Sequence, residues 1–146
     1  MNDFMAQALQ QARLAALRGE VPVGAVLVRG TRVVAAAGNR VEELSDPTAH
    51  AEVLVLRAAA AEAGSPRLGD CDLYVTLEPC PMCAAAIAFA RLRRVYFGAY
   101  DPKGGGVEHG PRVFDHPTCH HRPEVVGGLG ERDCAAVLRD FFRERR

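Results

Sequence analysis

Two short motifs constrain this chain more than any other feature of its sequence. Residues 50–52 read His-Ala-Glu, and residues 79–83 read Pro-Cys-Pro-Met-Cys. Cysteines three positions apart at a helix start share one helix face, so both sulfurs can bind one metal ion. Pro81 suits the first helical position, because the N–H that it lacks would have no partner there. The capping-type run at 46–48 (Asp-Pro-Thr) places His50 in the first turn of a second helix. We therefore expect two helix N-termini to converge on one metal.

The number of ligands distinguishes a catalytic metal site from a structural one. His50, Cys80 and Cys83 supply one imidazole and two thiolates. A catalytic zinc binds three protein ligands and keeps its fourth position for water, whereas a structural zinc needs a fourth protein ligand. The other cysteines and histidines of the chain do not have a recognisable metal-binding spacing from these three. We therefore predict one catalytic Zn²⁺ per chain.

Glu52 is the expected acid–base group of this site. Two thiolates neutralise Zn²⁺, so the bound water should ionise less readily than in a site of neutral histidines, where its pKa falls to about 7. A base beside the water is therefore useful. A carboxylate two residues from a ligand points in another direction than the ligand does, so Glu52 need not bind the metal. It can take a proton from the water and return it to a departing group, which a nitrogen that leaves as ammonia requires.

Each motif alone has simpler interpretations. A Cys-x-x-Cys pair is found in redox sites and in structural zinc sites, and a His-x-Glu sequence at a helix start carries little information. Together, about 30 residues apart and each leading a helix after strand-like sequence, the two motifs favour a catalytic metal site. A noncatalytic, zinc-stabilised binding domain is a competing interpretation. Glu52 argues against it, because a structural site has no use for that carboxylate.

The rest of the sequence predicts an α/β fold. Apolar residues at spacings of four, three and four mark one face of an N-terminal helix that ends at Gly19. Strands that alternate with helices indicate βαβ units and a sheet covered on both faces. The helix face consists of Met5, Leu9, Ala12 and Ala16. The further elements are a hairpin over 24–38, a polar turn over 39–47, a helix over 49–63, a strand over 72–76, a helix from Pro81 and a strand over 93–100.

The last third of the chain contains a long irregular stretch and a terminal helix. Residues 101–122 include three consecutive glycines and four of the five histidines. These histidines leave two interpretations open, a second metal site and ordinary hydrogen bonding, of which we favour the second. An amphipathic helix follows, with Cys134, Val137, Leu138, Phe141 and Phe142 on its apolar side. The sequence contains no repeat or linker, so we predict a single domain over residues 1–146.

Charge and hydropathy limit where the protein acts. The formal net charge is zero, so any surface that attracts nucleic acid must be local. No apolar run approaches the roughly 20 residues of a membrane span, and the N-terminus is too polar for a secretory signal. We expect a cytoplasmic protein without membrane contact. In that compartment thiols stay reduced, so the five cysteines are ligands or small core residues.

Beyond these features, nearly the whole chain resembles the bacterial tRNA-specific adenosine deaminases of the cytidine and deoxycytidylate deaminase superfamily. The His-x-Glu and Pro-Cys-x-x-Cys motifs are the signature of zinc deaminases in general. The resemblance also covers residues 19–25 (GEVPVGA), 39–40 (NR), 46–52 (DPTAHAE), 74–83 (YVTLEPCPMC) and the terminal DFFR and RR. It implies a three-layer α/β/α sandwich around a five-stranded mixed sheet, and a homodimer.

The resemblance implies hydrolytic deamination of adenosine to inosine at the wobble position of an arginine tRNA. A zinc-activated water would attack, with Glu52 as the proton shuttle, and the tRNA anticodon loop would be the partner. Asn39 would hydrogen-bond the purine ring, and the backbone around Ala51 would read its edge. Val21 and Pro79 would form walls around the base. Asp101 and Lys103 would line the groove for the RNA strand. Phe142 and Arg143 would touch neighbouring nucleotides.

One stretch departs from the family pattern. After Asp101-Pro102-Lys103 the family has a small Gly-Ser segment, but here residues 104–110 read GGGVEHG, with Glu108 and His109 in place of the small pair. This departure and the zero net charge favour an alternative function, a zinc-dependent deaminase of free nucleobases or nucleosides such as guanine or cytosine. Asn39 and the terminal Phe-Phe-Arg favour the tRNA substrate more strongly.

Overall fold

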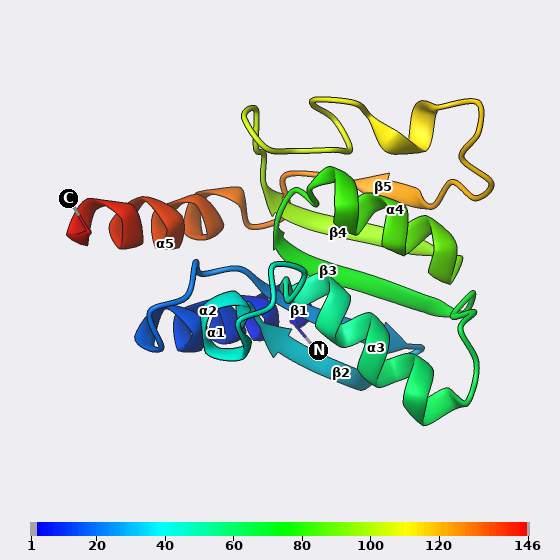
Figure 1. Ribbon diagram of the computed structural model, residues 1–146, viewed down its shortest axis with the longest axis horizontal. Coiled ribbons are helices and arrows are strands. Elements are labelled where there is room, and N and C mark those ends of the chain that lie inside the picture. The colour runs from blue at the N-terminus through cyan, green and yellow to red at the C-terminus, as the bar shows by residue number, and fades with distance from the viewer. Residues whose placement is uncertain (1–2, 146) are drawn as a thin grey trace.

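The fold is a five-stranded sheet with helices on both faces; the computed structural model describes residues 3–145 (Figure 1). The strand order is β2-β1-β3-β4-β5. β1 is antiparallel to β2 and β3, whereas β3, β4 and β5 are parallel to one another, so the sheet is mixed as expected. The strands are β1 (Gly24–Arg29), β2 (Arg32–Gly38), β3 (Cys71–Leu77), β4 (Arg94–Ala99) and β5 (Glu124–Val126).

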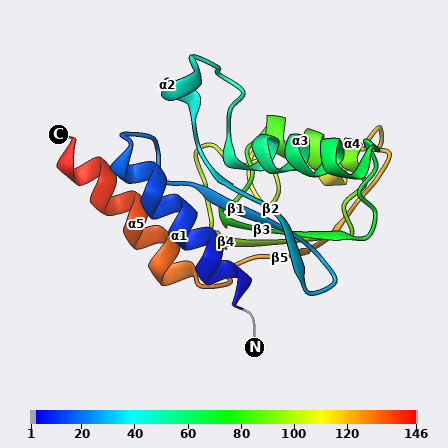
Figure 2. The same ribbon diagram turned by 90° about the horizontal axis from the view of Figure 1, so that it is seen from below.

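Two long helices cover each face of the sheet (Figure 2). α3 (Ala51–Ala63) and α4 (Pro81–Ala90) lie on one face, and α1 (Phe4–Leu17) and α5 (Glu131–Glu144) lie on the other. A short helix, α2 (Val41–Leu44), connects β2 to α3. This arrangement is the predicted three-layer α/β/α sandwich. Within residues 3–145, no helix is both long and apolar enough to cross a bilayer.

The alternation of side chains along the central strands creates two cores. On β1, Ala25 and Leu27 belong to the core beneath α3 and α4, whereas Val26 and Val28 belong to the core beneath α1. All four residues are buried. Because successive side chains of a strand point to opposite faces, a strand covered on both sides must be apolar throughout. This explains why the GAVLV segment is continuously apolar rather than alternating.

Glycines at the hairpin ends bring α1 close to the sheet. A Cβ added to Gly24 would overlap the carbonyl oxygen of Ala8, and one added to Gly38 would lie 2.6 Å from the carbonyl oxygen of Gln11. The helix therefore packs directly on the strand backbone. Three of the four predicted residues, Met5, Leu9 and Ala12, are buried; Ala8 and Ala15 are buried in addition, and Ala16 is only half-buried.

Two elements were not predicted from local sequence. The polar turn over 39–47 contains α2, whose first N–H groups bond to the side chain of Glu20 rather than to a neighbouring cap residue. β5 has only three residues, too few for a periodic pattern, and pairs with β4 beside an ion pair between Arg94 and Glu124. Both elements depend on contacts with residues distant in the sequence.

Candidate active site

His50 and Cys80 each occupy the N-cap position of a helix. α3 begins at Ala51 and α4 at Pro81. The sequence predicted His50 within the first turn of its helix, but it lies one position before that turn. Both cap residues have an extended backbone, with φ −73° and ψ 151° at His50 and φ −70° and ψ 170° at Cys80. Because α3 and α4 lie side by side on one face of the sheet, their N-termini meet at the same end (Figures 1 and 2).

The three residues predicted to bind metal lie together. The Sγ atoms of Cys80 and Cys83 lie 3.6 and 3.5 Å from Nδ1 of His50, and the ligand atoms of all three residues are within 4.8 Å of one another. Tetrahedral zinc with nitrogen and sulfur ligands separates its donor atoms by about 3.3–3.8 Å. In the part of the chain that the structure describes, this is the only such group. The trio therefore fits a zinc ion with one open position.

The pKa shifts within the group of His50, Cys80 and Cys83 favour a negatively charged thiolate at Cys80. A hydrogen bond from the Cys83 thiol lowers the pKa of Cys80 to about 4; burial opposes this shift and a bond with His50 adds to it. The same bond to Cys80, with burial, raises the pKa of Cys83. The hydrogen bond with Cys80 also raises the pKa of His50. These shifts favour a thiolate at Cys80 and a thiol at Cys83, and a bound metal ion would favour the thiolate at both because ligating thiols are deprotonated.

Glu52 lies on the first turn of α3, outside the group of ligand atoms. Its side chain is buried, and burial raises its pKa to about 7, against the lowering effect of a hydrogen bond with its own backbone. A carboxyl group that gains and loses a proton near neutral pH is suited to general acid–base catalysis. The geometry therefore places a proton-exchanging group beside the candidate metal site.

A cavity of about 440 Å³ opens over this cluster, a size typical of small-molecule sites. Val21, Asn39 and Asp101, three of the residues proposed to contact substrate, line it together with His50 and Glu52. Asn39 is 7% exposed, and its Oδ1 accepts a 2.8 Å hydrogen bond from the backbone N–H of Ala51, which is itself fully buried.

The other five proposed contact residues, including Ala51, lie outside the cavity lining. Pro79 is buried just before the candidate ligand Cys80, and Lys103 is exposed on the loop after β4. Phe142 and Arg143 are exposed near the end of α5. The helix is amphipathic as predicted, but its apolar side contains Cys134 and Phe141, while Phe142 is 50% exposed.

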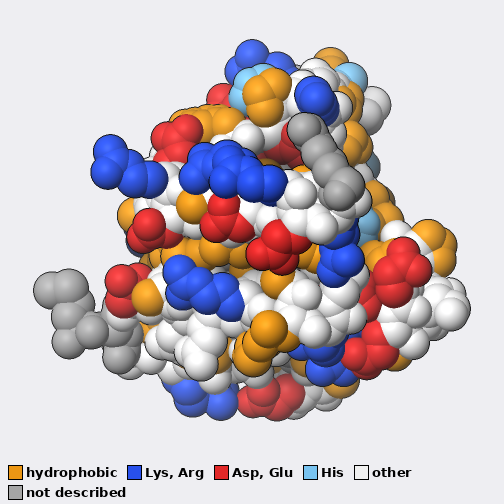
Figure 3. All heavy atoms as spheres, turned by 90° about the vertical axis from the view of Figure 1, so that its left-hand side faces the viewer, with side chains coloured by type: hydrophobic (Ala, Val, Ile, Leu, Met, Phe, Trp, Pro, Cys, Tyr) orange, Lys and Arg blue, Asp and Glu red, His pale blue; other side chains and the backbone are white. Residues whose placement is uncertain are grey.

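The end of α5 approaches the cavity through Arg145. Its Cζ lies 4.1 Å from the ring centroid of Phe141, and its Nη2 lies 3.7 Å from the position that a Cβ on Gly19 would occupy. Gly19 lines the cavity. The face that contains this end of the helix shows Lys and Arg side chains interspersed with Asp and Glu (Figure 3). This face therefore carries charges of both signs.

The cavity lining is acidic. The carboxylate residues that line it are Glu20, Glu42, Glu52, Glu78 and Asp101. Among the described residues, no Lys or Arg lines it. Since a phosphate would meet like charge there, the cavity is suited to a neutral base whose phosphates stay outside.

Sequence reasoning missed two buried carboxylates that hold the walls of this cavity. Glu20 accepts hydrogen bonds from the backbone N–H groups of Glu42 and Glu43, at 3.1 and 2.8 Å. Burial raises the pKa of Glu78, but hydrogen bonds from Asp101 and from residues 107–109 outweigh burial and hold it below the usual value. Glu78 lies between the apolar residues Leu77 and Pro79, which is the only local signal; the neighbours of Glu20 are exposed and give none.

Three of the four histidines of the 101–122 stretch, His109, His116 and His121, make side-chain hydrogen bonds. Nε2 of His116 donates to the carbonyl oxygen of Pro111, and Nε2 of His121 donates to that of Leu92, both at 2.6 Å. These histidines belong to no metal cluster within residues 3–145. These contacts agree with the simpler of the two interpretations for the three histidines that make them.

Known proteins match the chain over its whole length. The MafB19-like deaminase family matches residues 1–146. A tRNA-specific adenosine deaminase of Agrobacterium fabrum is 61% identical over 145 residues, which cover 99% of this chain and 95% of that one. A solved structure from studies of A-to-I editing by tRNA:A34 deaminases has a TM-score of 0.91 at 60% identity, covering 92% of this chain and 98% of that one.

A more distant match is the structure of a guanine deaminase from Bacillus subtilis. It has a TM-score of 0.67 at 32% identity, and the alignment covers 99% of this chain and 94% of that one. The TM-score and the sequence identity are therefore both higher with the tRNA deaminase structure than with this guanine deaminase. The chain belongs to the MafB19-like deaminase family and, within it, to the tRNA-specific adenosine deaminases.

Proposed function

We propose that this chain deaminates adenosine to inosine at the wobble position of tRNA, and that an arginine tRNA is its substrate. The observation that carries the proposal is the group of His50, Cys80 and Cys83 beside buried Glu52, under a cavity without basic lining among the described residues. The 61% identity to a tRNA-specific adenosine deaminase supports the choice of substrate.

We infer that His50, Cys80 and Cys83 hold one Zn²⁺ per chain. One imidazole and two thiolates are a ligand set that zinc accepts, and the donor separations agree with tetrahedral geometry. When bound, zinc would supply the Lewis acidity that lets water attack at neutral pH. Both cysteines would bind zinc as thiolates, which a zinc ion stabilises.

Glu52 moves the protons in the proposed reaction. The carboxylate takes a proton from water as the water oxygen adds to C6 of the purine, and then delivers it to the exocyclic nitrogen. The C6–N6 bond breaks, and the products are inosine and ammonia. A pKa of about 7 makes both directions of this proton transfer accessible at neutral pH.

Asn39 orients the base. Since Oδ1 is occupied by the N–H of Ala51, the Nδ2 group remains to donate to a purine ring nitrogen. Val21 lines the cavity and would pack against the base. Pro79 directly precedes Cys80 and supports its backbone. We assign recognition of the base edge to the backbone next to Ala51.

The RNA strand reaches the cavity along the loop after β4 and the end of α5. Asp101 lines the cavity, and Lys103 next to it is exposed and available to phosphate. The exposed ring of Phe142 offers a surface on which a neighbouring base can stack, and Arg143 adds a positive charge beside it. Basic groups therefore lie around the cavity rather than inside it.

A comparison of substrates tests the proposed function. The protein is incubated with an arginine-tRNA anticodon stem-loop that has adenosine at the wobble position and, separately, with free guanine and free cytosine. Inosine and ammonia are measured. We expect both products from the stem-loop. Conversion of a free base with none of the stem-loop would instead establish the alternative, which residues 104–110 favour and the guanine deaminase fold allows.

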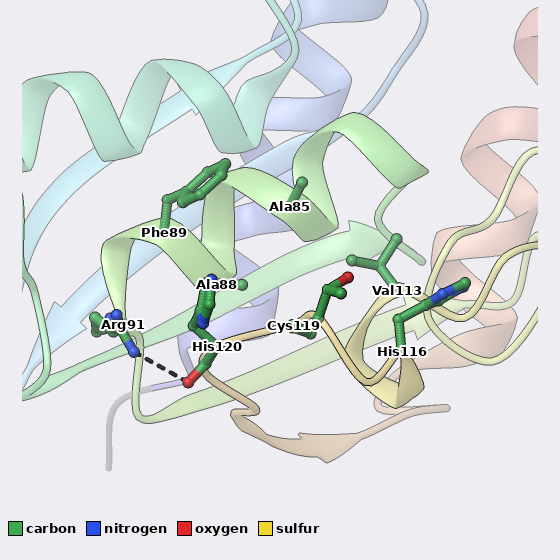
Figure 4. A pocket seen from close by; sticks show the side chains of 9 residues that line it. Ala85, Ala88, Phe89, Arg91, Val113, His116, Cys119 and His120 are labelled. Atoms are coloured by element: carbon green, nitrogen blue, oxygen red, sulfur yellow. Dashed lines mark hydrogen bonds between the residues drawn. The ribbon is translucent and has the colours of Figure 1, made fainter.

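We also propose a homodimer formed through the face of α3 and α4. Phe89 is 77% exposed on α4 and borders two apolar hollows of about 260 and 310 Å³, the first of which is shown in Figure 4. A projecting ring beside hollows on the same face can fill the corresponding hollow of a second copy related by a twofold axis. Such pairing would also remove an apolar patch from water.

We further propose that residues 1–146 act as one catalytic domain in the cytoplasm. A single sheet lies between both helix layers, which supports a single domain. The five cysteines carry free thiols, a state that a reducing compartment preserves.

A further inference from the structure

Glu78 makes an unusual number of hydrogen bonds for one side chain. It follows β3 directly, and its side chain is 0% exposed. Oε1 accepts from the backbone N–H of Asp101 at 3.0 Å and from Nδ1 of His109 at 2.8 Å. Oε2 accepts from the backbone N–H groups of Val107, Glu108 and His109 at 3.2, 2.9 and 3.0 Å. One carboxylate thus binds both ends of the loop over residues 101–109.

The same loop lies against the start of the ligand-bearing helix. The N–H of Gly106 donates to the carbonyl oxygen of Pro79 at 2.8 Å. A Cβ on Gly106 would lie 2.6 Å from the nitrogen of Pro81, and a Cβ on Gly105 would overlap the Glu78 carboxylate. Only glycine lets the loop backbone approach this closely. The loop, Glu78 and the Cys80 segment therefore form one packed unit.

The loop is also a wall of the cavity. Asp101 and Gly104 line it, and Oδ1 of Asp101 accepts a 2.9 Å hydrogen bond from the N–H of Gly104. The bond from Asp101 to Glu78 fixes the start of this wall, and the bonds from residues 107–109 fix its end. The position of the wall is thus set by a side chain that does not belong to the loop.

We propose that Glu78 is a positioning residue for substrate binding, which holds the 101–109 loop as a wall of the cavity with His109 as its side-chain partner. The identity of the substrate rests on the proposed function, but the loop geometry does not. A carboxylate suits this role because all five partners are donors. A glutamine would offer one acceptor oxygen and would turn an NH₂ group toward at least one N–H of the loop.

Glu78→Gln tests the proposal through two readouts besides turnover. Hydrogen exchange of the backbone amides of residues 101–109 should become about tenfold faster, since loss of one buried hydrogen bond shifts an equilibrium by about that factor. KM for the stem-loop should rise about tenfold while kcat changes less than about threefold. Zinc content by elemental analysis should match that of the parent, because no ligand has changed.

Two further sets of variants separate positioning from general destabilisation. Asp72 is a buried carboxylate at the other end of β3, where it accepts hydrogen bonds from Arg93 at 2.9 and 2.7 Å. Asp72→Asn should leave loop exchange and KM unchanged. His109→Ala should raise both in the direction of Glu78→Gln. His109→Asn should restore them, because its side-chain nitrogen can donate from the place of Nδ1. Even if Glu78→Gln does not fold, His109→Ala and His109→Asn test whether the contact between Glu78 and His109 positions the loop.

Parent-like loop exchange and KM in both Glu78→Gln and His109→Ala would overturn the proposal. Equal increases in Asp72→Asn and Glu78→Gln would also overturn it, because they would reveal a loss of stability rather than of loop position. A parent protein that turns over a free base and leaves the stem-loop untouched would contradict the proposed function. In that case the exchange measurements still test the role of Glu78, and KM is measured on the free base.

Discussion

Oδ1 of Asn39 accepts a hydrogen bond of 2.8 Å from the backbone N–H of Ala51, the first residue of α3. Asn39 follows the last residue of β2, and Ala51 follows the candidate ligand His50. The bond therefore ties the end of the sheet to the helix start that carries the candidate metal ligand His50. It also fixes which end of the amide is available to substrate, because only the oxygen can accept this N–H.

Asn39→Asp separates these two roles. The aspartate keeps an oxygen for the N–H of Ala51, so the fold and the zinc content should be close to those of the parent. It replaces the proposed Nδ2 donor to the base by a second acceptor. We expect kcat/KM on the stem-loop to fall about 10- to 100-fold, the loss expected for one buried hydrogen bond to substrate. Steady-state kinetics and thermal melting provide the test, and parent-like kinetics would show that Asn39 has only a structural role.

Glu52→Gln should separate chemistry from binding. The amide has nearly the same shape as the carboxyl group but cannot exchange the proton. We expect turnover of the stem-loop to fall by roughly 10²–10⁴, with zinc content and stem-loop affinity preserved because Glu52 lies outside the ligand group. Single-turnover assays and equilibrium binding measure the two quantities. Turnover at a tenth of the parent rate or more would mean that another group moves the protons.

Phe89→Glu should disrupt the proposed dimer. A charge at this position would be buried in the hollow of a second copy, which is unfavourable without a partner charge. Light scattering on a gel-filtration column should show a dimer for the parent and a monomer for the variant. Leu17→Glu is the matched control, because Leu17 is 85% exposed on α1, on the other face of the sheet. A dimer that persists in Phe89→Glu would place the interface elsewhere.

Arg143→Ala should weaken RNA binding in a salt-dependent manner. If Arg143 contacts a phosphate, its removal flattens the log–log dependence of stem-loop affinity on salt by about 0.7. Arg67→Ala removes the same charge from an exposed position after α3 and should leave the slope unchanged. Binding is measured over a range of salt concentrations for both variants and the parent. Identical slopes in all three proteins would assign Arg143 to a solvated helix end.

The grouping of the three candidate metal ligands could be predicted from sequence, because their spacing reports directly on geometry. Two N-cap positions and an i, i+3 pair are local features, and the structure brings these residues together. Glu20 and Glu78 could not be found in this way. Their hydrogen-bond donors lie 22 to 31 residues away along the chain, and no local pattern records a contact of that kind.

Phe141 and Phe142 illustrate a second limit of sequence reasoning. Adjacent aromatic residues on an amphipathic helix both fit the edge of its apolar side, and their order decides little. The structure buries Phe141 in the groove between α5 and α1, with Arg145 over its ring, and leaves Phe142 half-exposed. Which of the two rings is buried depends on where α1 packs against α5. The periodicity of apolar residues along α5 gives no information about that position.

Zinc content measured together with inosine formation tests the central claim most directly. Three proteins are compared on the arginine-tRNA stem-loop: the parent, Cys83→Ala and the control Cys71→Ala, in which a buried cysteine of β3 outside the ligand group is changed. We predict about one zinc per chain and inosine formation for the parent and for Cys71→Ala, and neither for Cys83→Ala. Full zinc occupancy or parent-like inosine formation in Cys83→Ala would contradict the account.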